Sequence, residues 1–250
     1  MMNRNRTTTM IDEKTMNSRA SVYELTLEKG RNMEHILQYY PLILKGLLTT
    51  IEVFLLTLIF SIPLGLPIAL GEESKFKPLA FICKAYVFIF RGTPLVLQLM
   101  FFYFFPSIVL NVQIDAVTTA IITFILNYAA YFAEIYRGGM KSIDNGQYEA
   151  AKALGLSGRQ TLFGIVIPQT MRVILPPVFN EVITLVKDTA LVMVIGAGDL
   201  MKATNSVVNT TSRISPLMIA AVIYLLMTFV LTLGANSLEK YFGKYDRKGE

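Results

Sequence analysis

Long uncharged stretches alternate with short charged segments along this 250-residue chain. A helix needs about 20 consecutive apolar residues to cross a bilayer, and five stretches come near that length. They are 53–70, 92–110, 116–133, 173–198 and 214–238. A soluble domain has too small an interior to hide so many uncharged runs. The pattern therefore predicts an all-α integral membrane protein with about five transmembrane helices.

The fourth stretch differs from the others because it contains Glu181, Lys187 and Asp188 between apolar flanks. If 173–198 only dips into the membrane and returns, the number of spans falls to four. The residues before the second stretch, 79–90, are apolar apart from Lys84. They either extend the second helix or form an elbow at the membrane interface.

Composition agrees with a membrane protein and excludes several other classes. The chain is 53% hydrophobic and only 16% charged, whereas soluble domains average about 25% charged residues. The net charge of +5 is expected to orient the loops, since no basic face interleaved with aromatic residues suggests nucleic-acid binding. Cys83 is the only cysteine, which excludes an intrachain disulfide and a cysteine-ligated metal site.

The distribution of Lys and Arg predicts the orientation, because short cytoplasmic loops are enriched in both. The loops 71–78 and 134–172 and the C-terminal tail are rich in them, and 111–115 has none. With five spans, the rich loops share the cytoplasmic side, so the C-terminus is expected inside and the N-terminus outside. The basic polar tail 1–40 disagrees with its exported placement.

The N-terminal tail offers little chemistry of its own. It has no apolar segment of the kind that a signal peptide requires, although 33–40 is expected to be amphipathic. The sole histidine, His35, lies there with no cluster around it. No catalytic or metal-ligating grouping is visible in the chain, so we do not expect an enzyme.

The segment 146–168, GQYEAAKALGLSGRQTLFGIVIP, stands out within the largest basic loop. Its composition predicts a short helix over 148–156, ended by Gly155 and Gly158. Small side chains on this helix would let the groove of another protein approach closely. Glu149 suits the start of a helix and is placed to pair with a basic partner residue. The alternative is an amphipathic helix that lies on the membrane surface.

The sequence Glu149-Ala150-Ala151, followed by Gly155, Ile165 and Pro168, resembles the EAA loop of binding-protein-dependent ABC permeases. Other motifs are similar to the polar amino-acid branch of that family. They are Arg91-Gly92-Thr93-Pro94-Leu95 with Gln98, the run from Tyr131 to Gly139, the run from Ser142 to Gln147, Asn180-Glu181-Val182-Ile183, and Lys187-Asp188-Thr189-Ala190-Leu191. The likeness covers 42–238 and leaves the polar tail unexplained.

The resemblance implies a type I ABC importer transmembrane domain over 41–240, between the tail 1–40 and a short basic tail, 241–250. It implies alternating access in a bacterial plasma membrane. A cytoplasmic coupling helix would dock on a dimer of ATPase subunits through Glu149, Ala150, Ala151, Leu154 and Gly155. This chain has no GxxxxGK[ST] phosphate loop, so ATP and Mg would be bound by that partner, and no cofactor is expected here. A second permease half, identical or related, and an extracytoplasmic amino-acid-binding protein complete the expected assembly.

Charges inside the fourth stretch are the first candidates for a substrate site. An ionisable residue at the centre of a span costs about 2.5–3.5 kcal/mol. Glu181 and Asp188 are two helical turns apart and share one face, while Lys187 lies roughly 100° around from Asp188. The carboxylates would hold an α-ammonium or a basic side chain. Alternatively, they form a structural ion pair with Lys187.

Other polar residues in the spans are weaker candidates. Gln98 and Asn127 either line the substrate path or form hydrogen bonds between helices. Arg91 and Glu134 are expected near the cytoplasmic ends of their helices, where they anchor the helix ends or brace the coupling loop. Tyr128 is expected to be an ordinary interfacial or lining aromatic residue.

The leading hypothesis is a permease subunit for polar amino acids, with cationic amino acids among the candidates. An ion-coupled secondary carrier that uses Glu181 and Asp188 is the alternative. Such carriers are often built from repeated halves, and no internal repeat is visible. A membrane enzyme or a structural membrane protein would be the third class, and an enzyme would need a catalytic grouping.

Overall fold

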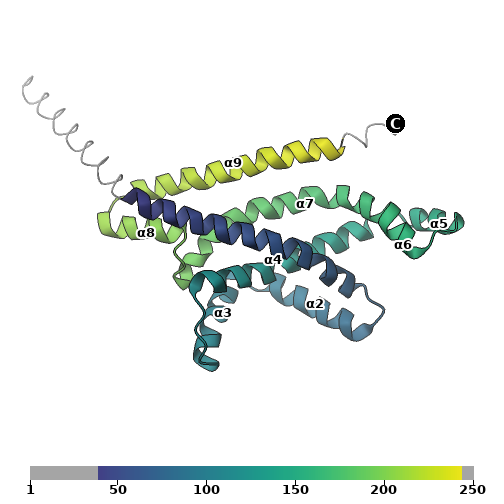
Figure 1. Ribbon diagram of the computed structural model, residues 1–250, viewed down its shortest axis with the longest axis horizontal. Helices are drawn as coiled ribbons and strands as arrows, with labels where there is room; N and C mark the ends of the chain where they lie inside the picture. Colours follow the sequence, from purple (N-terminus) through teal and green to yellow (C-terminus); the bar gives the residue numbers. More distant parts are fainter. Residues whose placement is uncertain (1–38, 244–250) are drawn as a thin grey trace, which may run out of the picture. The chain divides into compact units, whose positions relative to one another are not determined.

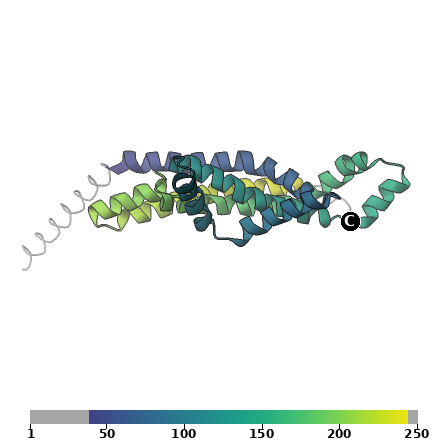
Figure 2. The same cartoon turned by 90° about the horizontal axis from the view of Figure 1, so that it is seen from below.

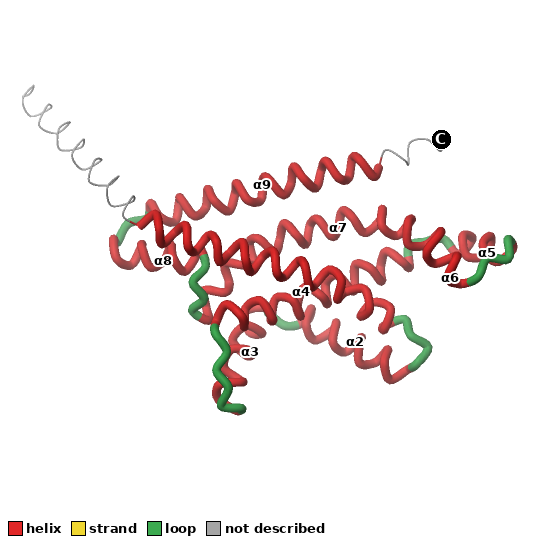
Figure 3. The backbone as a smooth tube through the Cα atoms, viewed as in Figure 1, coloured by secondary structure: helices red, strands yellow, loops and turns green. Residues whose placement is uncertain are grey.

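The computed structural model describes residues 39–243, which are helices joined by short loops and contain no strand (Figures 1 and 3). The chain divides into two units, Met1–Leu44 and Lys45–Glu250, and the description below concerns the second. The predicted tail as far as residue 38, with His35 and most of the 33–40 stretch, lies outside the described residues, as does 244–250.

Three described helices are long and apolar enough to cross a membrane: Tyr39–Glu72, α4 (Ala116–Lys141) and α9 (Ser215–Gly243). A bent pair, α2 (Lys77–Gly92) and α3 (Leu95–Val109), adds a fourth candidate if the two halves form one span. The all-helical membrane fold is confirmed, and the number five stays a prediction.

The second predicted span, 92–110, is wrong at its start, because the helix breaks there. The axes of α2 and α3 differ by 108°, with Thr93 extended (φ −116°, ψ 147°) between them. Pro94 explains the break, since its ring disfavours helical backbone at the preceding residue. Residues 79–90 belong to α2, a helix of its own that begins at Lys77.

The fourth predicted span, 173–198, is helical without forming one regular helix. A π-helical turn, Leu162–Val166, leads into α7 (Ile167–Asp188), and a 3-10 helix, Thr189–Ile195, follows. Gly196 ends it with φ 83°, a left-handed conformation that glycine adopts without strain. Polar and charged residues keep α7 out of the group of helices that are apolar enough to span.

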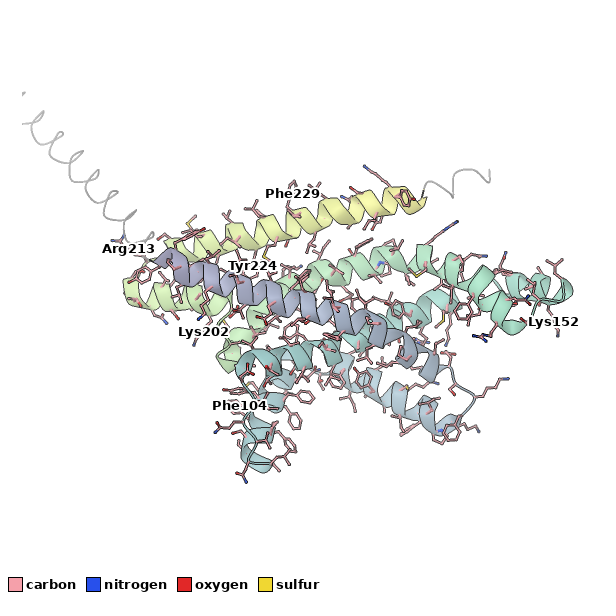
Figure 4. All side chains as sticks on the ribbon, in the orientation of Figure 1. Phe104, Lys152, Lys202, Arg213, Tyr224 and Phe229 are labelled. Atoms are coloured by element: carbon pink, nitrogen blue, oxygen red, sulfur yellow. The ribbon has the colours of Figure 1, made fainter. Side chains whose placement is uncertain are left out.

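Helix α4 is central, and α9 is peripheral. In the most apolar part of α4, 56% of the residues are buried, against 6% in α9. The core around α4 includes Phe124, Tyr128 and Phe132, packed with Leu185 and Val186 of α7. Large side chains of α9 such as Phe229 project outward instead (Figure 4). This face of α9 is suited to contact lipid.

The basic segments lie together within the second unit. The turn at 73–76, the short helices α5 (Asn145–Ala153) and α6 (Gly158–Thr161) and the end of α9 lie at one end (Figures 1 and 2). Helix α8 (Leu200–Thr211) lies at the other end. This arrangement is consistent with the predicted topology, in which the basic loops share one side.

Candidate functional site

The two carboxylates of the fourth predicted span lie on one continuous helix, α7, which packs against α4. Gly139 of α4 permits this close approach, because an added Cβ there would lie 2.2 Å from Ile174 Cγ2. Further along the same pair of helices, the Tyr128 hydroxyl donates a hydrogen bond of 2.8 Å to Asp188 Oδ2. Asp188 is therefore held by α4, which the sequence did not indicate.

Glu181 is half-buried and has no hydrogen bond or ion pair within the part of the chain that the structure describes. Its charge interacts with those of Asp188 on α7 and Arg91 on α2. A carboxylate that is partly removed from water and has no partner is costly unless a ligand supplies one. Glu181 thus has the properties expected of a substrate-binding group.

Lys187 is exposed and forms no ion pair with Glu181 or Asp188 between residues 39 and 243. The structural ion pair proposed as an alternative is therefore not formed within this single chain. The side chain remains free to meet something outside it.

Gln98 and Asn127 lie at the break between α2 and α3, both buried. Asn127 Nδ2 donates to Gln98 Oε1 (2.9 Å) and to the Phe90 carbonyl oxygen (3.1 Å). Gln98 Nε2 donates to the Phe90 carbonyl (2.9 Å) and to both Thr93 oxygens, Oγ1 (2.7 Å) and the carbonyl (3.2 Å). These amides satisfy backbone groups that the broken helix leaves open.

Arg91 lies in the last turn of α2, at the end of this helix that is far from the turn at 73–76. Because α2 begins at Lys77, Arg91 is about 20 Å further along the helix axis from the loop side. Its guanidinium carbon lies 5.4 Å from the centroid of the Tyr131 ring, and Nη1 lies 3.6 Å from Glu134 Oε2. The expectation that Arg91 and Glu134 lie near the cytoplasmic ends of their helices stays a prediction, and the two side chains do lie together.

Glu134, seven residues before the end of α4, belongs to a cluster of ion pairs. Arg137 donates from both Nε and Nη2 to its two carboxylate oxygens. Arg137 also lies 3.9 Å from Glu72 Oε2 and 3.8 Å from Glu73 Oε1. Lys141 binds Glu73 at 2.8 Å, and this bond lowers the pKa of Glu73. The cluster ties the end of α4 to the turn that follows the first helix.

The predicted coupling segment forms a hairpin of two short helices, α5 and α6. A left-handed turn at Gly155 joins them. Helix α5 begins at Asn145, with Asp144 accepting from the Gly146 N–H, and ends at Ala153, short of the predicted 156. Gly155 has φ 75°, and a Ser157–Gln160 capping box starts α6. Lys152 marks the tip in Figure 4.

Four of the five residues predicted to meet a partner are exposed on this hairpin: Glu149, Ala150, Leu154 and Gly155. Leu154 has 77% of its surface exposed, which is unusual for a leucine without an external contact. Ala151 is only 1% exposed, so it packs inside the hairpin. The hairpin is therefore accessible, and its surface carries an exposed leucine among polar residues.

The sequence did not predict the roles of two polar residues, Tyr128 and Asp199. Tyr128 binds Asp188. Tyr128, Tyr131 and Glu134 follow one another at intervals of three residues, so they lie on one face of α4. That spacing was the signal in the sequence. Asp199 is fully buried at the start of α8, where it accepts from the N–H groups of Met201 (2.9 Å) and Lys202 (3.1 Å). Burial raises its pKa to about 6.

Comparison with known proteins gives a consistent picture. Residues 61–243 match the model of a family described as "Binding-protein-dependent transport system inner membrane component". The arginine transport system permease protein ArtQ of Bacillus subtilis (strain 168) is 40% identical over 201 residues, 80% of this chain and 92% of the relative. The L-cystine transport system permease protein TcyB of the same organism is 36% identical, with 84% and 90% covered.

Solved structures agree with the family match. The crystal structure of an amino acid ABC transporter with histidines contains a chain that is 34% identical, with a TM-score of 0.77. The match covers 82% of this chain and 96% of that one. The methionine ABC transporter MetNI in an inward-facing conformation is 18% identical at a TM-score of 0.64, which shows a shared fold.

Proposed function

The chain belongs to the family of binding-protein-dependent transport system inner membrane components, and from this premise we propose that it is the permease subunit of an ABC importer for polar amino acids. Relatives named for arginine, L-cystine and glutamine transport support this substrate class. The observation that carries the proposal is the half-buried, unpartnered carboxylate of Glu181 beside a second carboxylate on α7.

We propose that Glu181 and Asp188 bind the substrate. They differ in whether they already accept a hydrogen bond within the chain. Glu181 is free to accept an α-ammonium or a basic side chain. Asp188 already accepts from Tyr128, and it can accept more because a carboxylate offers several lone pairs. Lys187, exposed nearby, is proposed to face the second permease half. Gln98 and Asn127 shape the substrate path at the break between α2 and α3. They do so by holding the backbone there, because their amide groups already form hydrogen bonds with it.

The energy is proposed to enter through the α5–α6 hairpin. Its exposed Leu154 and Glu149 offer an apolar contact and a charge to a separate ATPase subunit, which would hold ATP and Mg. A second permease copy or a close relative, and an extracytoplasmic amino-acid-binding protein, complete the assembly in the plasma membrane. In this arrangement the C-terminus is cytoplasmic and the N-terminus extracytoplasmic.

The decisive experiment is ATP-driven uptake in proteoliposomes that contain the reconstituted complex and its loaded binding protein. Glu181→Gln keeps the size of the side chain and removes its charge, so we expect uptake at limiting substrate to fall about tenfold or more, at unchanged complex yield. Glu239→Gln, near the end of α9, is the matched control and should transport normally. Normal uptake by Glu181→Gln would contradict the site, and uptake driven by an ion gradient without ATP would favour the carrier.

The docking role is tested separately with Glu149→Lys. This exposed substitution should leave insertion intact and abolish substrate-stimulated ATP hydrolysis, because it places a positive charge where a basic partner residue is expected. Glu149→Gln should be milder. Unchanged ATP-driven uptake with Glu149→Lys would remove the hairpin from the coupling mechanism.

A further inference from the structure

We propose that Arg91 binds the α-carboxylate of the transported amino acid, and that Arg137 keeps Arg91 available by occupying Glu134. This inference rests on the proposed function, because it assigns the acidic end of the same substrate. It makes Arg91 a binding residue and Arg137 a positioning residue.

The guanidinium of Arg91 has no hydrogen bond among residues 39–243. Its contacts there are the face of Tyr131 and the 3.6 Å approach to Glu134, which is longer than a hydrogen bond. Its side chain is 40% exposed, so its donors are accessible. A guanidinium offers a planar fork that matches a carboxylate, which makes arginine the preferred residue for this recognition.

Glu134, the carboxylate closest to Arg91, is already bonded to Arg137. Both oxygens of Glu134 accept from Arg137, Oε2 from Nε at 3.1 Å and Oε1 from Nη2. A two-point bond of this kind is strong and fixes the orientation of the carboxylate. Glu72 and Glu73 hold Arg137 from the other side and keep it at Glu134. Arg91 is thereby spared a tight internal ion pair.

The charges of Arg91 and Glu181 are complementary to those of an α-amino acid. An α-amino acid presents an ammonium and a carboxylate a few bonds apart, so its site needs both signs of charge. Glu181 on α7 supplies the negative charge and interacts electrostatically with Arg91 on α2. Tyr131 of α4, under the guanidinium, supports the positive side by a cation–π contact. A site that contains both signs of charge suits a zwitterion better than a simple cation.

The binding test uses the permease–ATPase complex in nanodiscs without the binding protein, so that only the permease selects. The tracer is tritiated L-arginine, L-glutamine or L-cystine, whichever the wild-type complex takes up, and the competitor is the matching decarboxylated amine. In the wild type the amine should bind about 10- to 100-fold more weakly than the amino acid. Arg91→Gln should shrink this gap to about threefold or less, and Arg91→Lys should keep part of it.

The outcomes separate this inference from the function on which it rests. If the wild type takes up none of the three amino acids with ATP, the proposed function is overturned. If uptake and the Glu181→Gln defect are as expected but Arg91→Gln keeps the full gap, only the role of Arg91 is overturned.

The positioning role is tested by suppression. Arg137→Gln releases Glu134 to pair with Arg91, so the dissociation constant should rise about tenfold. Adding Glu134→Gln in the same chain should restore it, although the contacts of Arg137 with Glu72 and Glu73 remain lost. Glu134→Gln alone should bind as tightly as the wild type. If the double variant binds as poorly as Arg137→Gln, Arg137 has a structural role and the positioning claim is wrong.

Discussion

Two groups of polar residues on the helices around α4 differ in how completely they are hydrogen-bonded. At the elbow, Gln98 and Asn127 bond to each other and to backbone groups of the broken helix. Arg91, which lies over the Tyr131 ring, and Glu181 have no hydrogen bond within the described chain. Leaving polar groups unpaired in an apolar setting is costly, so paired groups indicate a structural task and unpaired ones indicate a missing ligand. Mutations should therefore damage folding at the first cluster and transport at the second.

The largest effect is expected for Asn127→Leu. It leaves Gln98 Oε1 without its donor and weakens the satisfaction of the Phe90 carbonyl, at about 1–3 kcal/mol for each group. The yield of assembled complex and its melting temperature should fall sharply. Uptake normalised to the complex that does assemble should stay close to wild type, in contrast to Glu181→Gln. A stable complex that has lost transport would move Asn127 into the substrate site.

An intermediate effect is expected at Asp199, a buried carboxylate with backbone donors and no charged partner at salt-bridge distance within residues 39–243. Since the folded pKa is about 6, above the ordinary 3.8, the folded state binds the proton more tightly than the unfolded state. The stability gained is complete below about pH 4 and is lost as the pH rises through about 6.

Asp199→Asn mimics the protonated form, so it should remove this loss. Between about pH 5 and pH 7.5 the wild type should lose about 1.4 kcal/mol more stability than the variant. Thermal unfolding of the purified complex at both pH values measures the difference. Equal pH dependence in the two proteins would mean that Asp199 stays charged in the folded state.

The smallest effect is expected for Tyr128→Phe, which tests Asp188. This carboxylate is intermediate between the fully bonded amides of Gln98 and Asn127 and Glu181, which has no hydrogen bond within the described chain. The variant removes one hydrogen bond to Asp188, worth about 1–2 kcal/mol, and leaves the packed ring in place. We expect a small drop in melting temperature and a change in apparent substrate affinity of no more than about tenfold. A loss of transport as large as that of Glu181→Gln would show that Asp188, correctly held, is the principal substrate group.

Features that depend on local sequence could be predicted from it, whereas features that depend on contacts between distant residues could not. The helices around 53–70, 116–133 and 214–238 follow from uncharged runs, which depend on local composition alone. Family membership follows from short motifs such as Glu149-Ala150-Ala151. The break at Thr93–Pro94 had a local signal in Pro94 but lay inside an uninterrupted apolar run, and hydropathy does not detect a bend.

Sequence alone determined that the chain is helical, that it belongs in a membrane, and which residues carry charge there. Only the tertiary structure decided which of these polar residues are satisfied, because their partners are distant in the sequence: Phe90 for Asn127, Tyr128 for Asp188, Glu72 for Arg137. Spacing along one helix shows which side chains share a face. Whether a neighbouring helix brings a donor to that face depends on how the helices pack. That contact separates the structural amides Gln98 and Asn127 from Arg91 and Glu181, which have no hydrogen bond within the described chain.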